Sequence, residues 1–313
     1  MYAQVSAGFP GLAVNDERLV VDRRQGLDAG LERLYIHYLS KEVEPFEIGR
    51  DYAAGLWAAE AALLGQTPLA LKGQLSGPIS WGLMVTDQER RPILYDDILA
   101  DALARHLRLK AEWQERYLRR FTAQPIIFLD EPYLSAFGSA FVAIGRDLAL
   151  DLLEETLAGL TGLKGAHCCG NTDWGLLLAT SINVLSLDAY TCAHTLALYP
   201  EALTAFLERG GLIAWGLIPN TVEAYKETPA SLLARFEAAL TALEEKGLSR
   251  QRLLETAFIT PACGVGGLEP ALAEHIFALT RATALLARER YLGLGRPAED
   301  AAALASRPPG GGI

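Results

Sequence analysis

The chain has 313 residues, half of them hydrophobic, and a formal net charge of −10 at pH 7. This length accommodates one large domain with a sizeable core, and the acidic balance argues against a nucleic acid or an anionic membrane as a partner. The sequence shows neither an export-signal pattern nor an apolar run long enough for a membrane helix, and its four cysteines do not form a disulfide framework. We therefore expect a cytoplasmic protein with reduced thiols.

The chain opens with two helical patterns, at 27–40 and 48–64, and has no convincing pair of core strands before residue 68. Short apolar runs then alternate with amphipathic stretches. Strands are expected at 69–75, 126–130, 163–169, 184–188, 212–217 and 258–261, and helices at 96–119, 146–160, 199–209, 229–246 and 268–291. Repeated strand–helix–strand order with right-handed crossovers predicts an α/β fold with a parallel sheet.

Polar or special residues end five of the predicted strands. These residues include Ser76, Asp130, His167, Asp188 and Cys263, each at, near or just after the end of its strand. Because active sites of TIM-type barrels lie at the C-terminal ends of the strands, this convergence favours a (β/α)8 barrel over an open sheet. Six strands are clear, so we expect a barrel that is incomplete at the N-terminus. Residues 1–296 would form one catalytic barrel domain, and the Ala-, Pro- and Gly-rich tail 297–313 would be disordered.

The most specific chemistry lies in His167-Cys168-Cys169 and in the distant Cys263. Strand side chains alternate between faces, so His167 and Cys169 point to one side and Cys168 to the other. Zinc binds Cys thiolates and His nitrogens, and a catalytic zinc has three protein ligands and one open position. The alternative is that these are small residues of a core strand, since free Cys is commonly buried.

Further candidates are open to more than one interpretation. Asp188 could be an oxygen ligand, a partner of a ligand, or a helix N-cap. Of Asp130 and Glu131, one could cap the next helix while the other faces solvent. Ser76 lies in a segment that could place NH groups at a ligand or form a tight turn, and Trp215 could line a substrate wall or belong to the core.

Together these motifs resemble the zinc-dependent thiol methyltransferases of the uroporphyrinogen decarboxylase and methionine synthase superfamily. The similarity is to the catalytic barrel of cobalamin-independent methionine synthase, especially its short form, and extends to the corrinoid-linked coenzyme M methyltransferases. It covers roughly residues 65–293. The matching segments are Asp130-Glu131-Pro132, His167-Cys168-Cys169-Gly170-Asn171-Thr172, Leu185-Ser186-Leu187-Asp188 and Pro261-Ala262-Cys263-Gly264. Several motifs in the right order are more specific than any one alone.

The resemblance implies one Zn²⁺ per chain, with His167, Cys169 and Cys263 as ligands. Asp130 would act in catalysis by holding the amino group of a thiol such as homocysteine. Asp188 stands where methionine synthases usually have Glu, and would act in catalysis as a direct ligand, through water, or by orienting His167. Further substrate contacts would come from Glu131, Ser76 and Trp215.

The implied reaction is methyl transfer to homocysteine, which gives methionine. Only a thiolate attacks efficiently, and zinc deprotonates a bound thiol. Methylcobalamin on a corrinoid protein is the expected donor, and a methylfolate is second. Coenzyme M as acceptor, porphyrinogen decarboxylation, and a truncated non-catalytic zinc-binding chain remain alternatives. The family's first two strands have no counterpart in this sequence, which leaves open whether a second chain, as in a homo-oligomer, supplies them.

Overall fold

The computed structural model describes residues 1–15, 18–24 and 26–293, and the chain divides into two compact units. The first unit holds Met1–Leu187 and Glu201–Leu212, and the second holds Asp188–Pro200 and Ile213–Ile313. The tail predicted to be disordered, 297–313, lies outside the described residues, and the single domain expected over 1–296 stays a prediction.

Four parallel strands form the sheet of the first unit. They are β3 (Leu71–Ser76), β5 (Pro125–Asp130), β6 (Leu163–Cys168) and β7 (Val184–Leu187), and each pairs with the next in this order. In β5, Ile127, Phe128 and Leu129 are all buried, because a parallel strand covered on both faces needs a continuous apolar run. Each of the four strands ends within two residues of its predicted bounds.

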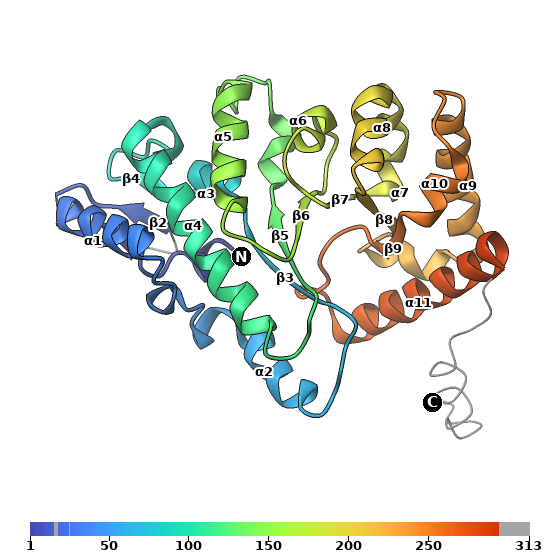
Figure 1. The fold of residues 1–313 in the computed structure, drawn as a ribbon, viewed down its shortest axis with the longest axis horizontal. Coiled ribbons are helices and arrows are strands. Elements are labelled where there is room, and N and C mark those ends of the chain that lie inside the picture. Colours follow the sequence, from blue (N-terminus) through green and yellow to red (C-terminus); the bar gives the residue numbers. More distant parts are fainter. Residues whose placement is uncertain (16–17, 25, 294–313) are drawn as a thin grey trace. The chain divides into compact units, whose positions relative to one another are not determined.

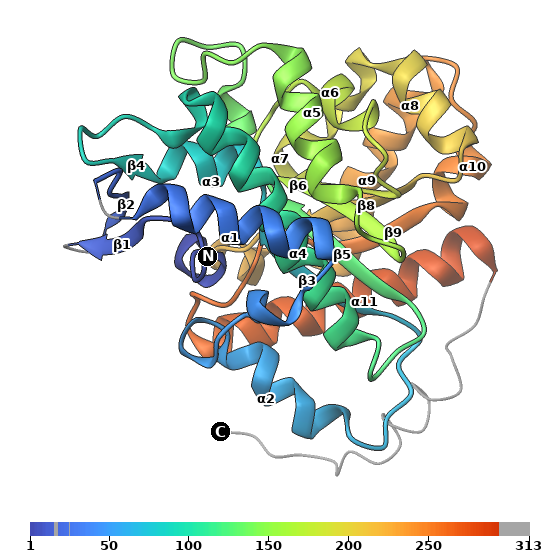
Figure 2. The ribbon, with the colours of Figure 1, turned by 60° about the vertical axis from the view of Figure 1, so that its left-hand side comes forward.

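One long helix covers this sheet, and two other helices pack against that helix. α4 (Asp97–Leu118) packs against β3, β5 and α5 (Arg146–Leu157), and α1 (Leu27–Ser40) lies against α4 (Figures 1 and 2). Asp96 caps α4 by accepting a hydrogen bond from the Leu99 NH at 2.9 Å. The unit also contains α2 (Ala54–Leu63), α3 (Pro78–Met84), α6 (Trp174–Leu178) and most of α8 (Pro200–Glu208).

The N-terminal region differs from its prediction in two ways. The helix expected at 48–64 begins only at Ala54, because residues Arg50–Tyr52 form a 3-10 turn and Ala53 has a non-helical backbone (φ −139°, ψ 38°). In addition, β1 (Leu12–Asn15) pairs antiparallel with β2, which pairs with the short β4 (Thr86–Asp87). This small sheet, completed by β2 (Arg18–Val21), is separate from the parallel sheet.

β3 stands first in the order of the parallel sheet, and the 3-10 helix Tyr2–Val5 lies against it. An edge strand presents unpaired backbone groups, so a covering segment protects it from pairing with another chain. The N-terminal region therefore helps to cover this edge.

The second unit contains β8 (Leu212–Ile218) and β9 (Ala257–Pro261), which pair in parallel. α9 (Pro229–Glu244) packs against α11 (Pro270–Leu292). Thr228 and Ser231 form a capping box at the start of α9, and Pro229 occupies the first helical position. Two short helices, α7 (Ala189–Cys192) and α10 (Arg250–Glu255), complete the unit.

The six parallel strands follow the sheet order β3-β5-β6-β7-β8-β9. Strands in chain order with helices between them form the repeat of an incomplete TIM-type barrel. The α/β fold class predicted from the sequence is therefore confirmed. Within the described ranges, no helix combines the length and apolar character that a membrane crossing requires.

Candidate functional site

A row of polar side chains crosses the sheet of the first unit near the C-terminal ends of its strands. Ser76 of β3 pairs with Asp130 of β5, Asp130 with His167 of β6, and His167 with Ser186 of β7. Residues paired side by side in a sheet point to the same face. The row therefore brings two hydroxyls, a carboxylate and an imidazole together on one face. The sequence predicted three of these residues at strand ends, namely Ser76, Asp130 and His167.

The imidazole of His167 is held from one side. Its Nδ1 lies 3.0 Å from Ser186 Oγ, whereas its Nε2 is buried and has no hydrogen-bond partner among the described residues. If Nδ1 carries the proton and donates it to Ser186, Nε2 presents a lone pair. A buried unpartnered acceptor is costly, so Nε2 fits the role of a metal ligand oriented by its second nitrogen.

The two cysteines that follow His167 take different positions. Cys168 is completely buried in the core, and its Sγ donates to the Gly170 carbonyl at 3.4 Å. Cys169 follows the end of β6 and is half-buried. The alternation predicted from the sequence therefore holds for Cys168, and Cys169 is the thiol of this pair that a ligand can reach.

The two acids at the end of β5, Asp130 and Glu131, are both buried, so the alternative that one of them faces solvent is wrong. The carboxylate of Glu131 accepts hydrogen bonds from the Ile79 NH at 2.9 Å, the Ser80 NH at 2.7 Å and the Ser80 hydroxyl at 2.5 Å. Burial raises the pKa of Glu131 to about 7, although these donors oppose the rise. Glu131 thus ties the end of β5 to α3, and its predicted contact with substrate stays a prediction.

Two hydroxyl groups accompany the acids. Ser76 is completely buried, and its Oγ has no hydrogen-bond partner in the described part of the chain. Tyr2, which the sequence analysis missed, has a pKa raised to about 12 by its partial burial and by nearby charges. Those charges belong to Tyr133, Glu131, Cys169 and Asp130. No local pattern marks Tyr2, because only the fold brings the second residue of the chain to this sheet.

In the second unit, Asp188 caps a helix, which is one of the interpretations that the sequence allowed. Its carboxylate accepts hydrogen bonds from the Thr191 NH at 3.1 Å and the Thr191 hydroxyl at 2.5 Å at the start of α7. Trp215 is completely buried in β8, with its ring 5.2 Å from that of Phe236 at 70°. It therefore packs in the core of this unit. Cys263 follows the end of β9 and is half-buried.

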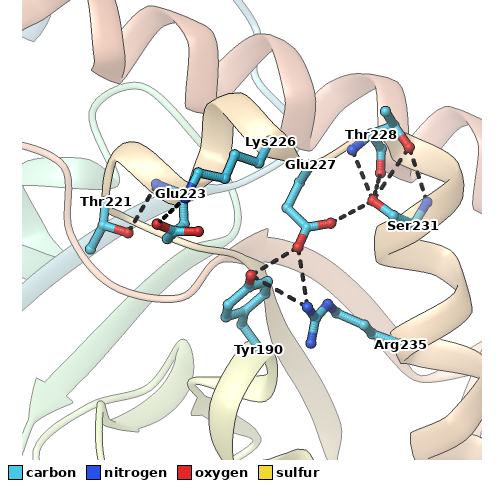
Figure 3. A network of polar contacts seen from close by, with 8 residues as sticks. All are labelled: Tyr190, Thr221, Glu223, Lys226, Glu227, Thr228, Ser231 and Arg235. Carbon is cyan, nitrogen blue, oxygen red and sulfur yellow. Dashed lines mark hydrogen bonds and ion pairs between the residues drawn. The ribbon is translucent and has the colours of Figure 1, made fainter.

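The segments that follow β7 and β8 are fixed to α9 (Figure 3). The Tyr190 hydroxyl donates to Glu227 at 2.8 Å, and the Arg235 guanidinium forms an ion pair with Glu227 at 3.2 Å. Arg235 also lies over the Tyr190 ring at 4.3 Å, which is a favourable cation–π geometry. Ser231 donates to the second oxygen of Glu227. These contacts order the segments that follow β7 and β8.

Among the described His, Cys and acidic residues, His167 and Cys169 of the first unit and Cys263 of the second have the ligand types of a metal site. One imidazole and two thiols suit zinc, which favours Cys and His ligands. The structure thus contains a candidate His/Cys metal site. Asp188 does not belong to this group, and the partner that orients His167 is Ser186.

Comparison with protein-family models finds no match, and no curated protein matches the chain. Among solved structures, the fold is similar to that of a methyltransferase from Methanosarcina mazei, with a TM-score of 0.51 and 13% sequence identity. The match covers 80% of this chain and 67% of that chain. At this identity the likeness concerns the fold, and it agrees with the incomplete TIM-type barrel.

Proposed function

We propose that the protein is a zinc-dependent thiol methyltransferase that methylates homocysteine to methionine. The observation that carries the proposal is the buried Nε2 of His167, which has no hydrogen-bond partner in the part of the chain that the structure describes. Ser186 orients the ring of His167, and Cys169 follows two residues later. The fold of the methyltransferase from Methanosarcina mazei supports the reaction type.

The zinc would be bound by His167, Cys169 and Cys263, one ion per chain, with the fourth position left for the substrate sulfur. Asp188 is the weaker candidate for a direct ligand, because its two oxygens already cap α7. Zinc in this site would keep the bound substrate thiol in its thiolate form at neutral pH. Two protein thiolates as ligands leave such a site electron-rich, which preserves the nucleophilicity of the bound sulfur.

The chain's own residues would hold the rest of the substrate. Asp130 lies beside His167 in the polar row and offers a carboxylate to the substrate's ammonium group. Ser76, next in the row, offers a buried hydroxyl that lacks a partner among the described residues. These contacts would fix the thiol relative to the methyl donor, and positioning of this kind lowers the barrier of a two-substrate reaction.

In the reaction, a sulfur–carbon bond forms as the bond between the methyl group and its donor breaks, and the thiol proton is released. We propose methylcobalamin on a corrinoid protein as the donor and a methylfolate as the second choice. Homocysteine is favoured over coenzyme M because Asp130 and Glu131 lie together at the strand end. Two buried acids favour an ammonium group and oppose a sulfonate.

The test is methyl transfer by the full chain reconstituted with zinc, with methionine measured by mass spectrometry. Methylcobalamin or methylfolate would be offered with homocysteine, and coenzyme M would be offered as a competing acceptor. His167→Ala should abolish methionine formation. Cys168→Ala is the matched control, because Cys168 points into the core, and it should retain activity. A zinc-loaded wild type that forms no methionine from either donor contradicts the proposal.

A further inference from the structure

We propose that the first unit contains a second binding site, which takes an apolar molecule with one carboxylate group. The site is a cavity of about 460 Å³ between α1, the segment 8–11 and the segment 45–46. No residue of the polar row is among those that line it. The inference therefore goes beyond the proposed function and is independent of the metal site.

The floor of the cavity is apolar and already in place. Phe9, Leu34 and Phe46 line it, and all three are buried. The rings of Phe9 and Phe46 contact the buried ring of His106 edge-on, at centroid distances of 5.4 and 5.5 Å. His106 is itself held by its Nε2, which lies 2.7 Å from the Val5 carbonyl oxygen. Because these walls are fixed by their neighbours, a ligand can bind without first ordering them.

The cavity is long and opens to solvent. The residues of α1 that line it run from Gly26 to His37 along one face of the helix, a length of about 16 Å. Gly8, Gly26 and Arg33 are exposed at its mouth. An apolar cavity of about 150 Å³ is enough to hold benzene. This cavity therefore accommodates a longer molecule than a single ring.

Arg33 supplies the charge at the mouth, and it has no hydrogen bond or ion pair with any residue in the described ranges. His37, the other basic residue of the lining, is already engaged, because its Nδ1 lies 2.8 Å from Glu42 Oε2. A free guanidinium can bind a carboxylate through two parallel hydrogen bonds, whereas Glu42 opposes a second anionic group. A polar group over the apolar floor would lose its water without gaining a partner. The combination therefore selects an apolar monocarboxylate.

The experiment compares 4-phenylbutanoate with its uncharged amide, 4-phenylbutanamide. Their binding to the full chain is measured by calorimetry for wild type, Arg33→Gln and the control Arg90→Gln. Arg90 is exposed in the same unit and does not line the cavity. The place of binding is read from the NMR amide signals of Gly8 and Gly30, which line the cavity, and of Gly159, which does not.

We expect wild type and Arg90→Gln to bind 4-phenylbutanoate equally, and Arg33→Gln to bind it roughly 10-fold more weakly, because an exposed charged pair lies at the lower end of its usual strength. The amide should bind all three proteins alike, which would show that the cavity is intact in Arg33→Gln. The signals of Gly8 and Gly30 should shift, and that of Gly159 should not.

Four results would overturn the assignment. They are no binding of 4-phenylbutanoate by the wild type, an unchanged affinity in Arg33→Gln, an equal loss in Arg90→Gln or for the amide, and unshifted signals of Gly8 and Gly30 in the saturated protein.

Discussion

Replacing Glu131 by glutamine should change how the stability of the protein depends on pH. The carboxylate is completely buried and accepts three hydrogen bonds from Ile79 and Ser80. Burial disfavours the charged form, whereas the donors favour it. The balance leaves the pKa of Glu131 at about 7, above its ordinary value of 4.5.

The sign and size follow from this rise. Because the pKa is higher in the folded than in the unfolded chain, the folded state holds the proton more tightly. The contribution of Glu131 to stability is then complete below about pH 4.5 and is lost as the pH rises through about 7. A rise from 4.5 to about 7 corresponds to about 3 kcal/mol of unfolding free energy.

The assay is urea unfolding of wild type and Glu131→Gln at several pH values between about 4 and 8. The difference in unfolding free energy should shift in favour of the variant by about 3 kcal/mol across this range. Glu89→Gln, at a side chain 55% exposed, controls for the loss of one acidic group. A difference for Glu131→Gln that stays constant with pH would refute the reasoning, because the donors would then fully offset the burial.

Three further predictions concern the same unit. Burial lowers the pKa of His106 to about 3, below the ordinary 6.5, so its contribution to stability is lost as the pH falls from about 6.5 toward 3. In urea unfolding, His106→Gln should reduce this loss of unfolding free energy by about 1.4 kcal/mol per pH unit. An unchanged pH dependence would contradict the lowered pKa of His106. Gly77→Ala should lower the unfolding free energy of the protein by about 1–3 kcal/mol, because a Cβ there would lie 2.3 Å from Glu131 Oε1. Gly49→Ala is the control, because a Cβ there meets nothing within 4 Å. Equal unfolding free energies for the two variants would contradict the predicted clash. Ser186→Ala should weaken zinc binding roughly 10- to 100-fold in a chelator competition, and an unchanged affinity would mean that the Nδ1 contact does not orient the ring.

The sequence predicted the parallel strands well because burial on both faces requires continuous apolar runs, as in β5. It missed α3, because Ser76-Gly77-Pro78 is compatible with both a tight turn and a helix start. The strands β1 and β2 were missed because each has four residues, too few for a reliable alternation.

The candidate site was predicted where a local pattern carried it. The apolar run before the His-x-Cys segment predicted the strand that carries His167, whereas Cys169 follows the end of β6, so its place on the same side as His167 stays a prediction. In contrast, Asp188 and Trp215 had more than one interpretation each. The choice depends on neighbours such as Thr191 and Phe236 that only the folded chain supplies. Tyr2 had no signal, because the charged residues that act on its phenol lie more than a hundred positions away in the sequence.

The central claim is that His167, Cys169 and Cys263 bind one zinc ion. The most direct test is the metal content of the full chain after purification with zinc supplied and without chelator, compared with Cys263→Ala. Cys192→Ala is the control, because it removes another half-buried thiol of the same unit. The account predicts about one zinc per chain in the wild type and in Cys192→Ala, and loss of the metal in Cys263→Ala. A metal-free wild type, or a Cys263→Ala protein that keeps its zinc, would contradict it.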